Sequence, residues 1–290
     1  MEIATPQIPI HEGAAYKPRN VDTDLIFWRR PADLRLVADF TTGGRDEGVA
    51  AMKNLEEEHR IQVRDLRGHE SEFSLPQNGF QYVWHEIPEL GGAADEEQVE
   101  QFIVPQTEEL VKKLTGASRT KTFKHRVRCL ASDPATLADN RAPAHSVHSD
   151  FTVAGALRNL VNTIPDAEER EQLLSKRMMI INIWRPLKTV TRDPLAVCDW
   201  GSLNHQNDGI ANRLVLPGGW NELGKYAFNE SQKWYYLSGQ RPQEALVFMQ
   251  FDSDRAEEGG VTVPHTAFVD PEFRDGPPRE SIEIKMFAFF

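Results

Sequence analysis

The sequence predicts a mainly β protein whose core is a barrel or a double-sheet jelly roll, with hairpins and helices added to it. After Arg177, seven short runs of β-forming residues follow one another, separated by Gly, Pro, Asn and Asp. Such a series is typical of closed or two-layered antiparallel sheets. The chain has 290 residues, of which 40% are hydrophobic and 27% charged, so it can bury a sizeable core.

The N-terminal part is expected to form hairpins and then helix. Short β-type runs separated by Gly, Asp and Glu are predicted at residues 34–40, 60–66 and 80–85. From 95 to 116, apolar residues recur at intervals of three and four, Pro105 breaks or kinks the run, and Gly116 supplies a C-terminal stop. This stretch therefore predicts a helix or a pair of helices.

The remainder of the chain is expected to form the core. A strand is predicted at 123–130, and a helical stretch runs from 152 to about 177, where Asp166 and Glu169 resemble a capping box. The seven later strands are predicted at 178–184, 195–198, 213–216, 234–237, 245–251, 261–269 and 281–289. We expect an N-terminal extension, residues 1–116, packed on a jelly-roll core, residues 117–290, with insertions at about 152–177 and 200–230.

Charge and composition exclude several classes of function. The 33 Lys and Arg against 44 Asp and Glu give a net charge of −11, so the chain offers no basic footprint for nucleic acid. The longest apolar runs, 178–181 and 245–249, are far shorter than the roughly 18 residues of a membrane-spanning helix. Two cysteines do not make a disulfide framework or a cysteine-rich zinc site.

The first residues, MEIATPQIPIHEG, contain neither the basic nor the long apolar region of a signal peptide. We therefore expect a cytoplasmic protein whose partner is a small-molecule substrate. A homodimer stays open, because an edge strand or the N-terminal arm could pair two copies.

Five residues form an ordered constellation that could carry chemistry. On a strand, residues two apart point to the same face, so His148 and Asp150 would present an imidazole and a carboxylate side by side. This pair alone is a weak signal, because such a match arises by chance in a chain with nine histidines. It gains weight from His265 in a later β-type run, and from Arg279 and Ser281 shortly after it.

Each part of this constellation has a chemical reason. Two imidazoles and one carboxylate on one face of an octahedral metal leave three positions open, which suits non-haem Fe(II) and oxygen chemistry. Two positions can take the keto acid end of 2-oxoglutarate, and the third takes molecular oxygen. The far carboxylate of 2-oxoglutarate then needs a buried, bidentate cation and a hydroxyl, which Arg279 and Ser281 would supply from one strand face.

Three other interpretations stay open at this point. The same three ligands could hold zinc, although a zinc hydrolase has no particular need for Arg279 and Ser281. A cupin-like metalloenzyme could use the triad without 2-oxoglutarate. A non-catalytic β-barrel binding protein would keep His148 and Asp150 as a hydrogen-bonded pair and His265 as a core histidine.

Six segments add a resemblance to a known family. In chain order they are His148–Thr152, Asn182–Leu187, Pro194–Asp199, Phe251–Ser253, Pro264–Phe268 and Arg279–Ile284. Together they resemble the hydroxylase/desaturase family, which includes fungal gibberellin desaturase-like enzymes and a bacterial cephem methoxylase component. The resemblance covers roughly residues 123–290.

The resemblance implies a double-stranded β-helix and an Fe(II)- and 2-oxoglutarate-dependent oxygenase of secondary metabolism. Such an enzyme hydroxylates or desaturates a small organic molecule and decarboxylates 2-oxoglutarate to succinate. By position, His148, Asp150 and His265 would bind the iron. The residues implied for binding the cosubstrate are Arg279, Ser281, Asn182 and Arg185. Because Asn182 and Arg185 are an odd number of residues apart on one strand, at most one of them lines the cavity.

Overall fold

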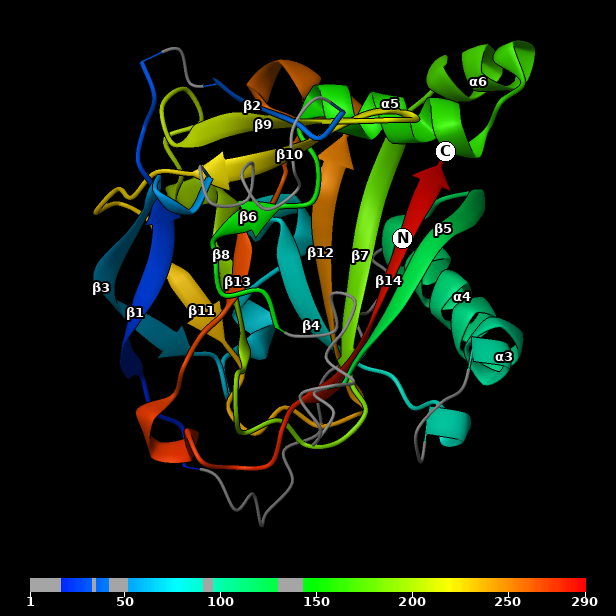
Figure 1. Cartoon of the computed structure of the whole chain (residues 1–290). Coiled ribbons are helices and arrows are strands. Elements are labelled where there is room, and N and C mark those ends of the chain that lie inside the picture. The colour runs from blue at the N-terminus through cyan, green and yellow to red at the C-terminus, as the bar shows by residue number, and fades with distance from the viewer. Residues whose placement is uncertain (1–16, 33–34, 42–51, 91–95, 130–142) are drawn as a thin grey trace.

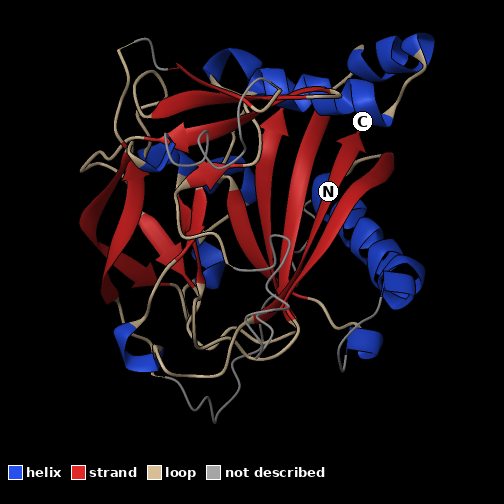
Figure 2. Cartoon of the chain, viewed as in Figure 1, coloured by secondary structure: helices blue, strands red, loops and turns tan. Residues whose placement is uncertain are grey.

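The computed structural model describes residues 17–32, 35–41, 52–90, 96–129 and 143–290. Two β-sheets enclose the interior, and helices cover the outside and one end of the molecule (Figures 1 and 2). The predicted mainly β fold is therefore confirmed. No helix within the described ranges is long and apolar enough to cross a membrane.

The larger sheet contains both short strands that carry the predicted histidines. Its nine strands, in the order in which they lie side by side, are β1 (Val21–Trp28), β3 (Glu56–Asp65), β11 (Trp234–Tyr236), β8 (Leu195–Cys198), β13 (His265–Ala267), β6 (His148–Ser149), β10 (Gly219–Tyr226), β9 (Gly209–Leu216) and β2 (Arg35–Asp39). Strands β13 and β6 are antiparallel neighbours, and His265 lies directly opposite His148 in their register.

Four of the five strands of the smaller sheet are almost completely buried. In order across the sheet, its five strands are β4 (Phe80–Trp84), β12 (Glu244–Asp252), β7 (Met178–Pro186), β14 (Glu280–Phe289) and β5 (Arg119–Cys129). Every residue of β7 and β12 is buried, because one face of this sheet packs against the larger sheet and the other against helix. Strand β5 is an edge strand.

Alternation along β14 decides which of its side chains reach the interior. The helix α4 (Val104–Thr115) lies beside β14 and β5 (Figure 1). Its buried residues join the same apolar cluster as Ile282, Ile284 and Met286. Since neighbouring side chains of a strand point to opposite faces, the intervening positions 281, 283 and 285 point toward the larger sheet.

Helix is present where it is predicted between residues 95 and 116. The stretch from 95 to 116 contains α3 (Glu96–Gln98), a π-helical turn (Val99–Ile103) and α4. Pro105 lies in the first turn of α4, where its missing N–H has no helical partner to lose. Gly116 ends the helix in the left-handed region, at φ 77°.

The second helical stretch divides into α5 (Val153–Thr163) and α6 (Ala167–Leu174). Asp166 caps α6 by accepting a hydrogen bond of 2.8 Å from the Glu169 N–H. In Figure 1, α5 lies across the upper ends of β12 and β7, beside the β9–β10 hairpin. A short helix, α2 (Leu75–Asn78), precedes β4.

Several strands differ from the predicted ones. The run predicted at 261–269 narrows to β13, and β1 and β10 were not expected. In β10, buried residues alternate with half-exposed polar and aromatic ones, so its sequence lacks the continuous apolar run of a buried strand. Residues 200–230 therefore contain a β-hairpin, formed by β9 and β10.

Arg185 stabilises the outer side of the smaller sheet. Its side chain is fully buried and donates to the backbone oxygens of His85 at 2.7 Å and Pro242 at 3.1 Å. Its second terminal nitrogen donates to His85 Nδ1 at 2.8 Å. Burial, followed by the nearby guanidinium of Arg185, lowers the pKa of His85 to about 4, so the imidazole stays neutral in the folded protein at neutral pH.

This pair predicts a pH dependence of stability. Between about pH 6.5 and 4 the unfolded chain binds a proton at His85 and the folded chain does not, so the free energy of unfolding falls as pH falls, by about 1–3 kcal/mol. His85→Asn keeps an acceptor for Arg185 and should flatten this part of the curve, measured by urea unfolding at several pH values.

The matched control is His69→Asn. His69 is exposed, and its contact with Glu72 raises its pKa, so it is protonated in both states over most of this window. The control should keep the wild-type slope. An unchanged slope in His85→Asn contradicts the assignment.

Candidate active site

Three ligand-type side chains meet between the two sheets. His148 lies in β6, Asp150 follows that strand directly, and His265 begins β13. One ligand atom from each of them lies within 4.8 Å of the other two. The backbone N–H of Asp150 donates to Gln250 Oε1 of β12 at 2.7 Å, which fixes the chain where it leaves the strand.

Backbone carbonyls orient both imidazoles. Nδ1 of His148 lies 2.8 Å from the oxygen of Ser146, and Nδ1 of His265 lies 3.2 Å from the oxygen of Val263. Each Nδ1 therefore carries the proton, which leaves both Nε2 atoms as free electron pairs. Nε2 of His265 lies 3.9 Å from Asp150 Oδ2.

The charge states of these groups suit a metal site. Burial lowers the pKa of His148 and of His265, so both imidazoles are neutral near neutral pH. Burial alone would raise the pKa of Asp150, but the positive charge of Lys285 outweighs it and holds this pKa well below its usual value. Two neutral imidazoles and a carboxylate are the protonation states that bind a divalent cation.

Asp150 is held by the smaller sheet. Asn182 of β7 donates from Nδ2 to Asp150 Oδ2 at 2.5 Å and to Glu283 Oε1 at 3.2 Å. The ammonium group of Lys285 forms an ion pair with Asp150 Oδ1 and lies 3.5 Å from Glu283 Oε1. The structure thus places Asn182 beside the triad.

Arg279 lies just before β14 and is buried, with 4% of its surface exposed. Its Nη1 donates to the backbone oxygen of Asp193 at 2.7 Å, and its guanidinium carbon lies 5.3 Å from the Trp184 ring centroid. Burial, and then the positive charge of Arg128, lowers its pKa to about 10. Among the described residues, neither Arg279 Nε nor the buried Ser281 Oγ has a hydrogen-bond partner.

One small cavity connects these two groups of residues. Its lining residues are Arg128, Ala144, His148, Trp184, Leu195, His265, Ala267, Arg279 and Glu283. The two imidazoles and the buried guanidinium therefore face the same space.

The residues present fit both a divalent metal and a small dicarboxylate. Lys285 contacts Oδ1 of Asp150, which leaves Oδ2 on the side of His265. A buried guanidinium nitrogen and a buried hydroxyl without partners cost free energy unless a ligand pairs with them. The unpaired atoms of Arg279 and Ser281 provide the positive charge and the donor that a carboxylate needs.

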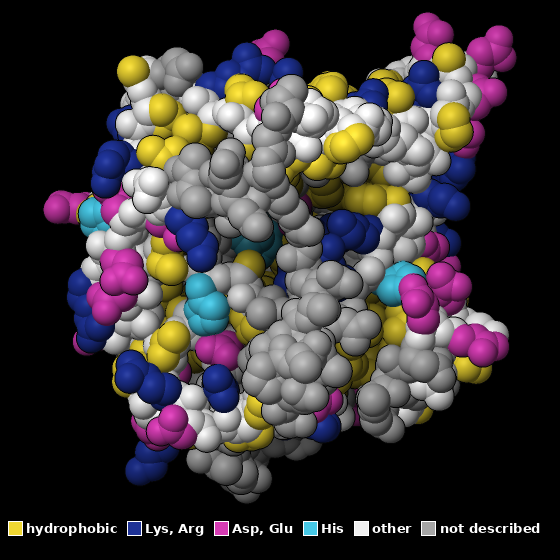
Figure 3. Space-filling model, viewed as in Figure 1, with side chains coloured by type: hydrophobic (Ala, Val, Ile, Leu, Met, Phe, Trp, Pro, Cys, Tyr) yellow, Lys and Arg dark blue, Asp and Glu magenta, His cyan; other side chains and the backbone are white. Residues whose placement is uncertain are grey.

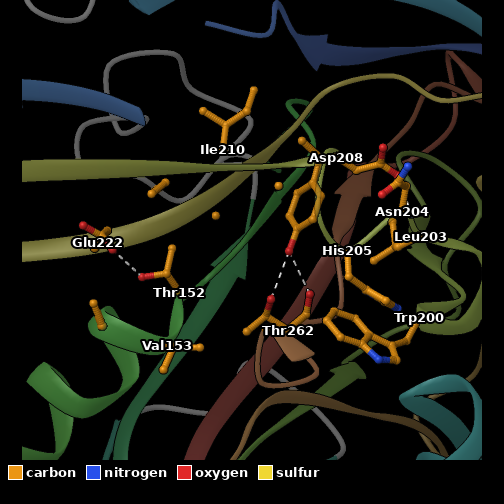
Figure 4. Close-up of a pocket in the computed structure, with 16 residues that line it drawn as sticks. Thr152, Val153, Trp200, Leu203, Asn204, His205, Asp208, Ile210, Glu222 and Thr262 are labelled. Carbon is orange, nitrogen blue, oxygen red and sulfur yellow. Dashed lines mark hydrogen bonds between the residues drawn. The ribbon is translucent and has the colours of Figure 1, made fainter. Parts of the chain in front are cut away.

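A larger cavity, of about 330 Å³, lies on the other face of the larger sheet. Figure 4 shows it between Val153, Trp200 and Ile210. Tyr226 lines it and donates to the backbone oxygen of Thr262 at 2.9 Å. The carboxylates in its wall are already paired, since Glu222 and Asp208 accept hydrogen bonds from neighbouring side chains.

The predicted site residues divide into two groups. The structure brings together five of them, namely His148, Asp150, His265, Asn182 and Arg279, and it places Ser281 on the same face of β14 as Glu283, which lines the cavity. Arg185 does not reach this cavity, because it points to the opposite face of β7 and contacts His85.

Sequence reasoning missed Glu283 and Lys285. The signal was present in the last strand, where Ser281, Glu283 and Lys285 alternate with apolar residues. A polar residue at every second position of a buried strand indicates a functional face.

Comparison with known proteins agrees with this geometry. A family model described as "Oxidoreductase/YMDC permease-like domain" matches residues 25–289. The hydroxylase/desaturase efuI of Hormonema carpetanum is 32% identical to the chain, over 96% of this chain and 97% of the relative. The alpha-ketoglutarate-dependent dioxygenase phiK of Fungal sp. (strain ATCC 74256) is 33% identical, over 79% and 83% respectively.

A solved structure shares the fold over nearly the whole chain. It is the iron and alpha-ketoglutarate-dependent endoperoxidase NvfI, which is 27% identical and superposes with a TM-score of 0.78 over 93% of this chain and 98% of its own. A relative of that name from Aspergillus novofumigatus is 32% identical over 80% of this chain. This chain therefore belongs to the hydroxylase/desaturase family of Fe(II)- and 2-oxoglutarate-dependent oxygenases.

Proposed function

We propose that the protein binds Fe(II) through His148, Asp150 and His265, binds 2-oxoglutarate through Arg279 and Ser281, and hydroxylates or desaturates a small organic molecule. The observation that carries this proposal is the shared cavity: the two imidazoles and the buried guanidinium line the same space. The family relationship supports the same reaction class.

Iron and 2-oxoglutarate, when bound, supply the oxidising chemistry: one atom of oxygen enters succinate as carbon dioxide leaves, and the other oxidises the substrate. The protein supplies position and charge. His148 and His265 present neutral Nε2 atoms because the carbonyls of Ser146 and Val263 accept their Nδ1 protons. Asp150 contributes the negative charge, and the family's protein ligands leave room for the cosubstrate and oxygen.

Arg279 would fix the far carboxylate of 2-oxoglutarate. Its backbone contact with Asp193 and its position against the Trp184 ring hold the guanidinium still, so little side-chain entropy is lost on binding. The Ser281 hydroxyl adds a donor on the same strand face. Because Arg279 itself is buried and lies against Trp184, these charge-assisted bonds form with little competition from water.

Asn182 and Lys285 act as positioning residues for Asp150. They hold opposite oxygens of its carboxylate, so the group cannot rotate freely between them. Such partners of metal ligands commonly change metal affinity by about 10–100-fold when they are removed.

The metal assignment predicts that His265→Ala and His148→Ala each lose most of their affinity for a divalent metal. Removal of one of three protein ligands should lower Mn(II) affinity at least about 100-fold, measured by electron paramagnetic resonance of free Mn(II), and should abolish succinate formation. His205→Ala, which removes an exposed histidine at the wall of the other cavity, is the control. Wild-type Mn(II) affinity in either histidine variant would contradict the assignment of that histidine as a metal ligand.

The cosubstrate assignment predicts a selective effect of Arg279→Lys. Lysine keeps the charge but loses the planar fork, so 2-oxoglutarate affinity should fall about 10–100-fold while Mn(II) affinity changes less than about threefold. Calorimetry of the Mn(II)-loaded protein measures both. Arg177→Lys is the control, because Arg177 forms a bidentate pair with Asp252 outside the cavity. Equal 2-oxoglutarate affinity in wild type and Arg279→Lys would contradict the proposal that Arg279 binds the far carboxylate of 2-oxoglutarate.

A further inference from the structure

A row of cations lies beside the candidate metal site. In the antiparallel register of β5 and β14, Lys124 lies opposite Lys285, and Arg126 lies opposite Glu283. Opposed residues of neighbouring strands point to the same face. Lys124 and Arg126 therefore share the interior face that carries Lys285, which contacts Asp150.

Lys124 and Arg126 have positive charges that the protein leaves uncompensated. Neither side chain forms a hydrogen bond or an ion pair within the part of the chain that the structure describes. Burial lowers the pKa of Lys124, and the neighbouring charges of Lys285 and Arg126 lower it further. Lys124 is exposed and Arg126 is half-buried, so an anion that binds beside β5 can reach both positive charges.

Lys225 of β10 adds a cation from the opposite sheet. It lies opposite His148 in the register of β10 and β6, and its ammonium group lies 4.3 Å from the centroid of the Trp28 ring. No carboxylate of the described residues lies within ion-pair distance of it. Positive groups therefore lie on two sides of the triad.

The cations adjoin a cluster of phenylalanines. Lys285 Nζ lies 5.8 Å from the Phe151 ring centroid, and Phe123 packs against both Phe151 and Phe287 at centroid distances of 6.1 and 4.6 Å. Phe123 is only partly buried and precedes Lys124 directly. Figure 3 shows Lys and Arg atoms in dark blue within a hollow of this face, next to hydrophobic atoms in yellow.

2-Oxoglutarate does not account for these cations. Arg279, its proposed anchor, shares a cavity with the two imidazoles, and neither Lys124 nor Arg126 lines that cavity. Lys124 instead lies one strand spacing, about 4.8 Å, from Lys285, which contacts Asp150.

Building on the proposed function, we propose that the substrate is an organic acid with an apolar, ring-containing body. Its carboxylate pairs with Lys124 and Arg126, and its body lies on the exposed part of Phe123, which brings its carbon skeleton toward the triad. Lys225 contributes to the positive potential that attracts the anion. The proposal explains why cations occupy an edge strand next to a partly exposed phenylalanine.

The test compares an acid and an amide of equal size. The full chain is loaded with Mn(II) and 2-oxoglutarate, and pyrenebutyrate or pyrenebutyramide is titrated into it while fluorescence anisotropy is recorded. We expect the acid to bind at least about tenfold more tightly than the amide, since charge-assisted hydrogen bonds form only with the acid. Lys124→Met/Arg126→Met should weaken the acid about tenfold and leave the amide within about twofold.

The control variant Arg60→Met/Lys112→Met removes the same charge from surface ion pairs on β3 and α4 and should leave both affinities unchanged. Equal binding of acid and amide by the wild-type chain overturns the proposal, and this comparison does not depend on whether a variant folds. An unchanged acid affinity in Lys124→Met/Arg126→Met overturns it as well. If the wild-type chain binds neither Mn(II) nor 2-oxoglutarate, the proposed function itself has failed, and this inference fails with it.

Discussion

One half-buried carboxylate joins the two sheets and holds the candidate site together. Asp150 leaves the larger sheet directly after β6, and its oxygens contact Asn182 and Lys285 of the smaller sheet. His148 and His265 approach it because β6 and β13 are paired in register. The position of the carboxylate therefore depends on both sheets, and the metal-ligand geometry depends on their packing.

Unpaired polar atoms around this carboxylate lower the stability of the folded protein. Arg279 Nε, Ser281 Oγ and Asn182 Oδ1 are buried and have no hydrogen-bond partner among the described residues. Each such atom costs about 1–3 kcal/mol in the folded state. A metal and an anion that pair with these groups would recover part of this cost, so ligand binding should also raise the stability of the fold. Half-buried Arg126 of β5 would gain a partner in the same way from the carboxylate of the proposed substrate.

Much of this site could be predicted from sequence because its signals are local. The spacing of His148 and Asp150, the later His265 and the Arg279–Ser281 pair are all visible in the chain, as is the Gly116 end of α4. Long-range pairing could not be predicted: nothing local shows that β5 places Lys124 opposite Lys285. Arg185 illustrates the same limit, since alternation separates it from Asn182 but does not say which of the two faces the cavity.

The central claim is that the triad and Arg279 hold iron and 2-oxoglutarate in one cavity. The most direct measurement is an anaerobic titration of the metal-free protein with Fe(II) and then 2-oxoglutarate, recorded by visible absorption. The account predicts a metal-to-ligand charge-transfer band of the chelated keto acid that saturates at one equivalent and is absent in Asp150→Ala. Iron that binds without this band, or a band that persists in Asp150→Ala, would contradict it.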